Sequence, residues 1–221
     1  MIKKIIKISL YTLFPHILAF ILAGIFVNLV KDTSQILEVS KMTSLTASGM
    51  LLITPISFLL SYIIFVRKKL PKFKMNKGEI IDVVKIMALG TLVNIIGQFL
   101  LFREITERQT VLNMIEPTGV LVAIFITGIF VPFCEELYFR KGLDEMIENK
   151  KIFYLVNISY FTFLHFDSNI KLISNLPILT FIFGFACLLT YYYKKNNNIY
   201  VPIIAHSLMN SIGIIAMFLG G

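Results

Sequence analysis

Six polar side chains stand inside apolar stretches of the C-terminal half of the sequence, and their types could support hydrolytic chemistry. They are Glu135, Glu136, Arg140, His165, His206 and Asn210. Ionisable groups in hydrocarbon cost about 2.5–3.5 kcal/mol each on insertion scales, so they persist where they face a bundle interior and have a function. Carboxylates and imidazoles that share an apolar pocket are typical of general acid–base catalysis. We therefore expect these residues to meet in one site.

The spacing of the acidic pair separates two roles. Glu136 and Arg140 are four residues apart, so on a helix they share a face and can form a charge-assisted pair. Glu135 is rotated by about 100° from Glu136, so its carboxylate is predicted to stay uncommitted. An uncommitted carboxylate is suited to proton transfer, whereas the paired one is expected to be structural. His206 and Asn210, also four apart, project together from another helix.

The depths of these residues predict how the helices meet. Glu135 lies fifteen residues before Lys150, which we take as the centre of a polar turn, and His165 lies fifteen after it. In a helical hairpin both would sit roughly 22 Å from that turn, so they are predicted to face each other. His206 lies only roughly 14 Å past the turn at 196–198. The hairpin that carries Glu135 and His165 must therefore protrude further than the next one.

Composition identifies the elements that position these residues as membrane helices. Of 221 residues, 57% are hydrophobic and 15% charged, whereas soluble domains are about 45–50% apolar and about 25% charged. The net charge of +8 gathers in loops between apolar runs, as is typical of loops that face anionic lipid. No nucleic-acid-binding motif accompanies it, so no nucleic-acid partner is expected.

The sequence predicts an all-α, polytopic transmembrane bundle that forms a single membrane domain over residues 1–221. Seven candidate spans occur at 8–30, 45–66, 84–102, 118–140, 152–166, 172–193 and 199–219. The fifth is short, because a span needs roughly 17–25 residues. The third has the charged residues Asp82 and Lys85 at its entry.

Loop charges give an orientation for this bundle. With alternate loops assigned to one side, fifteen basic residues fall on the side of the N-terminus: Lys3, Lys4, Lys7, Arg67, Lys68, Lys69, Lys72, Lys74, Lys77, Arg140, Lys141, Lys150, Lys151, Lys194 and Lys195. Five fall on the other side: Lys31, Lys41, Arg103, Arg108 and Lys171. This bias predicts a multi-pass protein of the cell membrane with its N-terminus in the cytoplasm and its C-terminus outside.

Three motifs resemble those of the CPBP (CAAX protease and bacteriocin-processing) family of intramembrane proteases, also known as type II CAAX prenyl endopeptidase or Abi proteins. Residues 135–140, Glu-Glu-Leu-Tyr-Phe-Arg, resemble its E-E-x-x-x-R motif. Phe161 to His165 resemble its F-x-x-x-H motif, and His206 to Asn210 its H-x-x-x-N motif, in the order of the family. The resemblance covers about 118–219, and the first three spans carry no matching motif.

The resemblance implies an endopeptidase that cleaves a membrane-associated peptide or protein, with 118–219 as catalytic core and 1–110 as accessory helices. Glu135 would act as general base on a water that His165 helps to position, and His206 and Asn210 would stabilise the oxyanion. Glu136, Arg140 and Phe161 would support the site. Bacterial members are tied to peptide maturation and bacteriocin immunity, and the Lys-, Ile- and Asn-rich usage suggests a low-GC bacterium.

Several alternatives stay open at this level. Glu135, His165 and His206 could form a zinc set, as in a metalloprotease, but they lack H-E-x-x-H spacing and Asn210 suits an oxyanion better than zinc. We favour a metal-free glutamate mechanism, with no cofactor assigned. The same fold could instead serve as a non-catalytic scaffold or immunity protein, with a sensor or peptide-export partner. A transporter is less favoured, because no internal repeat is visible. His16 is interpreted as a packing or interfacial residue.

Overall fold

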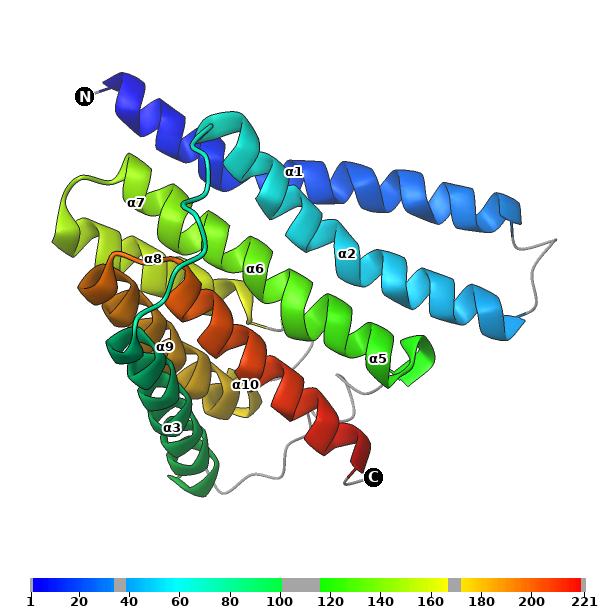
Figure 1. Cartoon of the computed structure of the whole chain (residues 1–221). Helices are drawn as coiled ribbons and strands as arrows, with labels where there is room; N and C mark the ends of the chain where they lie inside the picture. The colour runs from blue at the N-terminus through cyan, green and yellow to red at the C-terminus, as the bar shows by residue number, and fades with distance from the viewer. Residues whose placement is uncertain (1, 34–38, 101–115, 167–171, 220–221) are drawn as a thin grey trace.

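The computed structural model describes residues 2–33, 39–100, 116–166 and 172–219, and every regular element in these ranges is a helix (Figure 1). The all-α prediction is therefore confirmed for this part of the chain. The separate long helices are α1 (Ile2–Thr33), α2 (Val39–Phe65), α3 (Lys77–Leu100), α8 (Lys150–Leu164), α9 (Leu172–Asn196) and α10 (Tyr200–Leu219).

The region that holds the acidic motif is one composite helix. After a short 3-10 turn, η1 (Glu116–Thr118), it runs through α5 (Val120–Ala123), η2 (Ile124–Phe130), α6 (Val131–Glu136), η3 (Leu137–Gly142) and α7 (Leu143–Met146). The segments η2 and η3 are π-helical. A π-helical turn changes which carbonyls find backbone partners, and such turns often occur at functional sites.

Asparagine side chains start three of the helices. Asn76 and Glu79 form a reciprocal capping box before α3, with Glu79 N–H to Asn76 Oδ1 at 3.0 Å and Asn76 N–H to Glu79 Oε2 at 2.7 Å. The Asn149 side chain accepts from two backbone N–H groups at the start of α8. Asn198 Oδ1 accepts from Tyr200 N–H at 3.0 Å and starts α10. These caps fix where each hairpin turns, and hence the depth of every residue along the helices.

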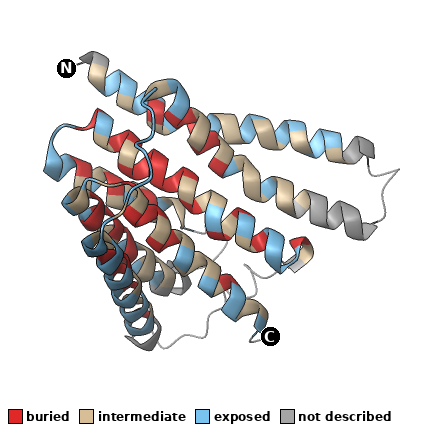
Figure 2. Cartoon of the chain, viewed as in Figure 1, coloured by how far each residue is buried: buried red, intermediate tan, exposed pale blue. Residues whose placement is uncertain are grey.

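The composite helix lies at the centre of the bundle. It contacts α2 on one side and α10 on the other, while α3, α9 and α10 pack together and α8 packs on α9 (Figure 1). Buried residues gather on the surfaces that face it (Figure 2). The outer faces are apolar and exposed, as Phe20 (82%), Leu121 (80%) and Phe163 (71%) illustrate. Apolar side chains on the outside and polar ones within are what a lipid solvent requires.

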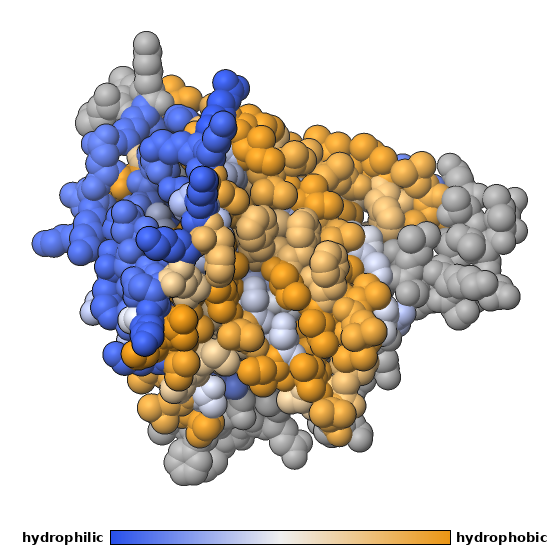
Figure 3. All heavy atoms as spheres, viewed as in Figure 1, coloured by the Kyte–Doolittle hydropathy of each residue, from blue (hydrophilic) through white to orange (hydrophobic). Residues whose placement is uncertain are grey.

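One end of the bundle is strongly hydrophilic, at the left of Figure 3. There Lys4 of α1 pairs with Glu148 at 2.6 Å, and Lys194 of α9 pairs with Asp144 of α7 at 2.5 Å. Asn198 donates to the carbonyl of Lys74 at 2.9 Å, which ties the loop between α2 and α3 to the turn before α10. Loops that the charge pattern assigns to one side therefore share one end. The side of the membrane that this end faces stays a prediction.

Five helical stretches among the described residues are long and apolar enough to cross a membrane. They are Lys4–Val30, Ser48–Phe65, Lys77–Gly97, Val120–Met146 and Tyr200–Leu219. The fifth predicted span corresponds to α8, whose 15 residues cover only about 22 Å of a core about 30 Å thick. The sixth corresponds to α9, which has 25 residues but is not among the five. Multiple membrane helices are thus supported, whereas seven crossings stay a prediction.

Candidate active site

Glu136 and Arg140 form the predicted ion pair at the core of the composite helix. Glu136 Oε2 lies 3.1 Å from Arg140 Nε, and both side chains are fully buried. The Phe161 ring of α8 covers the guanidinium at 4.4 Å from its centroid. The facing atoms of this pair miss hydrogen-bond alignment, and both Nη atoms lack a partner within the described structure. Charge attraction and the aromatic face therefore stabilise the pair. The Coulomb attraction is stronger here than at the surface because both side chains are buried away from water.

Both acidic residues also approach the imidazole of His206. Its Nδ1 lies 2.8 Å from Glu136 Oε1, and its Nε2 lies 3.9 Å from Glu135 Oε2. Glu136 therefore has a second partner besides the predicted Arg140. Its two carboxylate oxygens serve two partners, one from its own helix and one from α10.

The charge on Glu136 fixes the tautomer of His206. A carboxylate paired with arginine is ionised and can only accept, so Nδ1 must carry the proton and donate. In the neutral imidazole this leaves the lone pair of Nε2 directed toward Glu135. Among the described residues Glu135 makes no hydrogen bond of its own, in line with the predicted uncommitted carboxylate. A gap with two acceptors is suited to a water molecule, which can donate to both.

Asn210 lies one turn after His206 and fills a defect in the composite helix. Within η2 the bonding runs between residues five apart, as in Val131 N–H to the carbonyl of Ile126. The next donor would be Pro132, which has no N–H, so the carbonyl of Thr127 lacks a partner in this register. Asn210 Nδ2 donates to that carbonyl at 3.1 Å. The second N–H of its amide is left for another acceptor.

Gly128 allows α10 to come this close. A Cβ at this position would lie 2.5 Å from Ser211 Oγ and 3.3 Å from Ser211 Cα. The missing side chain brings α10 against η2, so that the short Asn210 side chain reaches Thr127.

His165 ends α8 and does not pair directly with Glu135. Its Nδ1 lies 2.8 Å from the carbonyl of Phe161 and must donate to it, and its ring lies 4.8 Å from that of Phe161. In the described region the ion-pair contact of Glu135 within 4.0 Å is with His206. The expectation that Glu135 and His165 face each other, with head groups within about 3–6 Å and a water between them, stays a prediction. Asp167, which follows His165, lies outside the described residues.

The hairpin turns two residues earlier than the sequence predicts. The hairpin turns between Met146 and Lys150, so its centre is Glu148 rather than Lys150. Glu135 is then thirteen residues from the centre and His165 seventeen, a mismatch of roughly 6 Å along the axis. The prediction that this hairpin protrudes further than the α9–α10 hairpin is confirmed, because His206, only eight residues past Asn198, touches Glu136.

The Phe161 ring contacts three of the residues of the candidate site. Besides covering Arg140, its ring lies 6.0 Å from His206 and 4.8 Å from His165. An edge of one aromatic ring against another is favourable by about 0.5–1.5 kcal/mol. The supporting role of Phe161 stays a prediction.

Sequence reasoning missed Asn157 of α8. It is fully buried, donates through Nδ2 to the carbonyl of Phe139 and accepts from Thr190 Oγ1 of α9 at 3.2 Å. It thereby ties the residue before Arg140 to two other helices. The available signal was an amide in the middle of a predicted span, which in lipid usually marks an interhelical hydrogen bond.

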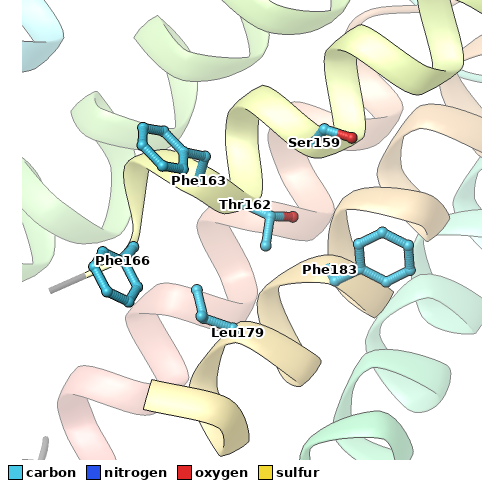
Figure 4. A pocket seen from close by; sticks show the side chains of 6 residues that line it. All are labelled: Ser159, Thr162, Phe163, Phe166, Leu179 and Phe183. Carbon is cyan, nitrogen blue, oxygen red and sulfur yellow. The ribbon is translucent and has the colours of Figure 1, made fainter. Parts of the chain in front are cut away.

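A pocket of about 380 Å³ lies between α8 and α9 (Figure 4). It is lined by Ser159, Thr162, Phe163, Phe166, Leu179 and Phe183. None of the predicted catalytic residues lines it, so it is separate from the carboxylate–imidazole cluster.

The described side chains do not form a ready-made zinc set. Within the described ranges no three His, Cys, Asp or Glu side chains are grouped closely enough to hold a metal ion. Glu136 is already shared between Arg140 and His206. Zinc on Glu135, His165 and His206 stays an alternative to the metal-free mechanism.

Comparisons with known proteins match the part of the chain that contains these residues. Residues 117–212 match the family model "Type II CAAX prenyl endopeptidase Rce1-like". A relative, the UPF0177 protein YxdF of Lactococcus lactis subsp. lactis (strain IL1403), is 32% identical over 110 residues, which are 50% of this chain and 58% of that protein. The chain thus spans less than two thirds of its relative's length. No solved structure matches.

Proposed function

Residues 117–212 belong to the type II CAAX prenyl endopeptidase Rce1-like family, and from this premise we propose that the chain hydrolyses a peptide bond within the membrane. The observation that carries the proposal is the cluster in which Glu135 and Glu136 both approach one imidazole, that of His206. In this cluster one carboxylate orients the imidazole and the other is left free for chemistry. Such a division of roles is the logic of general base catalysis.

In the proposed reaction, a water between Glu135 and His206 Nε2 is the nucleophile. Glu135 takes a proton from the water, whose oxygen forms a bond to the carbonyl carbon of the substrate. The carbonyl π electrons move to oxygen and give a tetrahedral oxyanion. The C–N bond then breaks, and Glu135 returns the proton to the departing amine. Glu136 holds His206 in the tautomer that faces this water.

We assign Asn210 and His165 to the substrate side of this reaction. Asn210 uses one N–H for the carbonyl of Thr127, and its second N–H can donate to an oxyanion. His165 directs Nδ1 at the carbonyl of Phe161, which leaves Nε2 for water or substrate. His206 becomes a second donor to the oxyanion when its Nε2 takes up a proton from bulk water, separate from the proton that Glu135 carries. The mechanism is a metal-free glutamate mechanism, with zinc on Glu135, His165 and His206 as the alternative.

The proposed substrate is a peptide or protein segment that enters from the bilayer of the cell membrane. Bacterial peptide maturation or bacteriocin immunity would be served by this activity, with a peptide-export system or a sensor as partner. The alternative hypothesis is a scaffold or immunity protein of the same fold that works by binding alone.

The test compares cells that produce the wild type, Glu135→Gln or the matched control Glu148→Gln. Glu148 is a surface carboxylate 90% exposed and paired with Lys4, so its loss should not reach the site. We expect Glu135→Gln to lower cleavage by about 10²–10⁴-fold, the usual contribution of a general base, so that uncleaved peptides accumulate in the peptidome. Equal amounts of folded protein are checked first. A Glu135→Gln strain whose peptidome and phenotype match the wild type would favour the scaffold.

A further inference from the structure

The first helix, which carries none of the family motifs, is joined to the acidic segment by a pair of tyrosines. Tyr138 Oη donates to the carbonyl of Tyr11 at 3.0 Å, and Tyr11 Oη donates to the carbonyl of Tyr138 at 2.8 Å. Their rings stack with centroids 4.5 Å apart, and both side chains are fully buried. We call this reciprocal pair the tyrosine clasp.

Each half of the clasp exploits a special backbone position. Pro15 stands inside α1 and has no N–H, so the carbonyl of Tyr11, four residues earlier, lacks its helical partner. In hydrocarbon such a carbonyl must find a donor, and the Tyr138 hydroxyl supplies it. On the other helix, a Cβ on Gly142 would lie 1.8 Å from Tyr11 Oη. Glycine at 142 is therefore what admits the Tyr11 phenol to the carbonyl of Tyr138.

Two other helices hold the clasp from its sides. The Phe58 ring of α2 stacks on Tyr138 at 4.6 Å, so the Tyr138 ring is held between α1 and α2. Tyr160 of α8 donates to the carbonyl of Thr12 at 2.9 Å and lies 3.4 Å from the Tyr138 hydroxyl. His16 Nε2 lies 2.6 Å from Tyr160 Oη, so His16 belongs to this network rather than to general packing. Tyr160 directly precedes Phe161, whose ring contacts residues of the candidate site.

The tyrosine clasp contacts the composite helix on the side opposite the candidate site. Tyr138 is two residues from both Glu136 and Arg140, hence roughly 200° around the helix from each. A rotation of about 10° at a side-chain radius of about 6 Å would move the Glu136 carboxylate by about 1 Å. Its hydrogen bond to His206 at 2.8 Å and the 3.9 Å gap to Glu135 depend on displacements of this size.

We propose that Tyr138 and Tyr11 are positioning residues of the peptidase, which fix the rotation of the acidic helix and thereby the geometry of Glu136 with His206. The α1 helix is accordingly a working part of the enzyme. This inference rests on the proposed function for its effect on cleavage. Its structural content, the coupling of α1 to His206, can be measured without a substrate.

The experiment records ¹⁵N spectra of histidine-labelled full-length protein in lipid nanodiscs. The chain has only three histidines, so the ring nitrogens of His206 can be assigned by substitution. Tyr138→Phe and Tyr11→Phe keep the rings and remove one donor each. The matched control is Tyr200→Phe, which removes a hydroxyl that donates to the carbonyl of Pro71 at 2.6 Å, at the polar end. We expect both clasp variants to displace the His206 signals and the control to leave them in place.

A double-substitution cycle keeps the test decisive if Tyr138→Phe does not fold. Gly142→Ala should displace the same His206 signals, because its Cβ expels the Tyr11 hydroxyl. In a Tyr11→Phe background that hydroxyl is absent, so the combined displacement should be smaller than the sum. Peptide accumulation in cells should follow, with cleavage lowered about tenfold to a hundredfold by the clasp variants.

The outcomes separate the two proposals. Folded clasp variants whose His206 signals match the wild type, or a control that shifts them equally, would overturn the positioning role. Displaced signals with a peptidome that never responds to Glu135→Gln would retain the coupling and reject the peptidase instead.

Discussion

Arg140 is a fully buried cation that is stabilised by a carboxylate and an aromatic face and not by hydrogen bonds. Its Nη atoms find no hydrogen-bond partner in the described structure, and its pairing rests on Glu136 and the Phe161 ring. A buried ion pair adds little net stability compared with apolar residues, but removing one partner leaves an uncompensated charge. Glu136 and Arg140 are therefore expected to respond to substitution differently from Glu135.

We predict that Glu136→Gln or Arg140→Met lowers the free energy of unfolding by about 3–5 kcal/mol, because each leaves a lone buried charge. The double substitution should lose less than the sum of the two, since no charge is then stranded. Glu135→Gln should change the unfolding free energy by less than about 1 kcal/mol, as Glu135 makes no ion pair closer than 3.9 Å. Denaturant titration in mixed micelles measures all four. Equal losses for the three single variants would contradict this separation of roles.

Spacing within one helix predicted the Glu136–Arg140 pair, because residues four apart on a helix are neighbours in any fold. The second partner of Glu136, His206, could not be predicted in the same way. That contact depends on the relative depth of two hairpins, which the caps at Asn149 and Asn198 determine. The sequence placed the centre of the turn at Lys150, two residues after Glu148, so it predicted the depth of each residue only roughly.

At the scale of the elements, the π-helical segments of the composite helix link its backbone to its neighbours. In η2 the carbonyl of Thr127 is bonded by Asn210, and in η3 the carbonyl of Tyr138 is bonded by Tyr11. In both places a nearby glycine gives the neighbouring helix the room to approach. The carbonyl of Tyr138 also accepts from Leu143 N–H, whereas Pro132 leaves that of Thr127 without a helical donor. The sequence contained these glycines and Pro132, but periodicity cannot predict the π register that makes Pro132 the partner of Thr127.

We predict that Gly128→Ala separates α10 from η2 and weakens the bond from Asn210 to Thr127. A Cβ there meets Ser211, whereas a Cβ on Gly213 of α10 has nothing within 4 Å, which makes Gly213→Ala the matched control. Because alanine favours a helix in both, the difference between the two variants isolates the crowding. We expect Gly128→Ala to be less stable than Gly213→Ala by about 1–3 kcal/mol and to have lower peptidase activity. Indistinguishable unfolding midpoints would show that α10 can yield at this contact.

For the molecule as a whole, hydropathy and loop charge predicted the class of fold and the grouping of loops, because lipid admits few architectures. They did not establish the number of crossings. The α8 helix has 15 residues, and neither α8 nor α9 is among the stretches identified as spans. The division into accessory helices 1–110 and a catalytic core 118–219 stays a proposal, and the tyrosine clasp argues that the two parts work together.

We predict that the N-terminus lies in the cytoplasm and the C-terminus outside, from the bias of fifteen against five basic residues. The bias persists, at fourteen against five, without Arg140, which is buried in the helix and not in a loop. Fusions of alkaline phosphatase and of a fluorescent protein to each end, produced in bacteria, report the side on which each end lies. Both ends on the same side would require an even number of crossings and would refute seven.

The distance along the chain between Glu136 and His206 has a consequence for biosynthesis. His206 follows Glu136 by 70 residues, so the ribosome completes the acidic helix well before α10 exists. During that interval Glu136 and Arg140 can neutralise each other within a single helix, which eases insertion by the translocon. The imidazole that faces Glu135 arrives only later, when α10 enters the bilayer. A nascent chain therefore holds both carboxylates before the histidine that completes the proposed site.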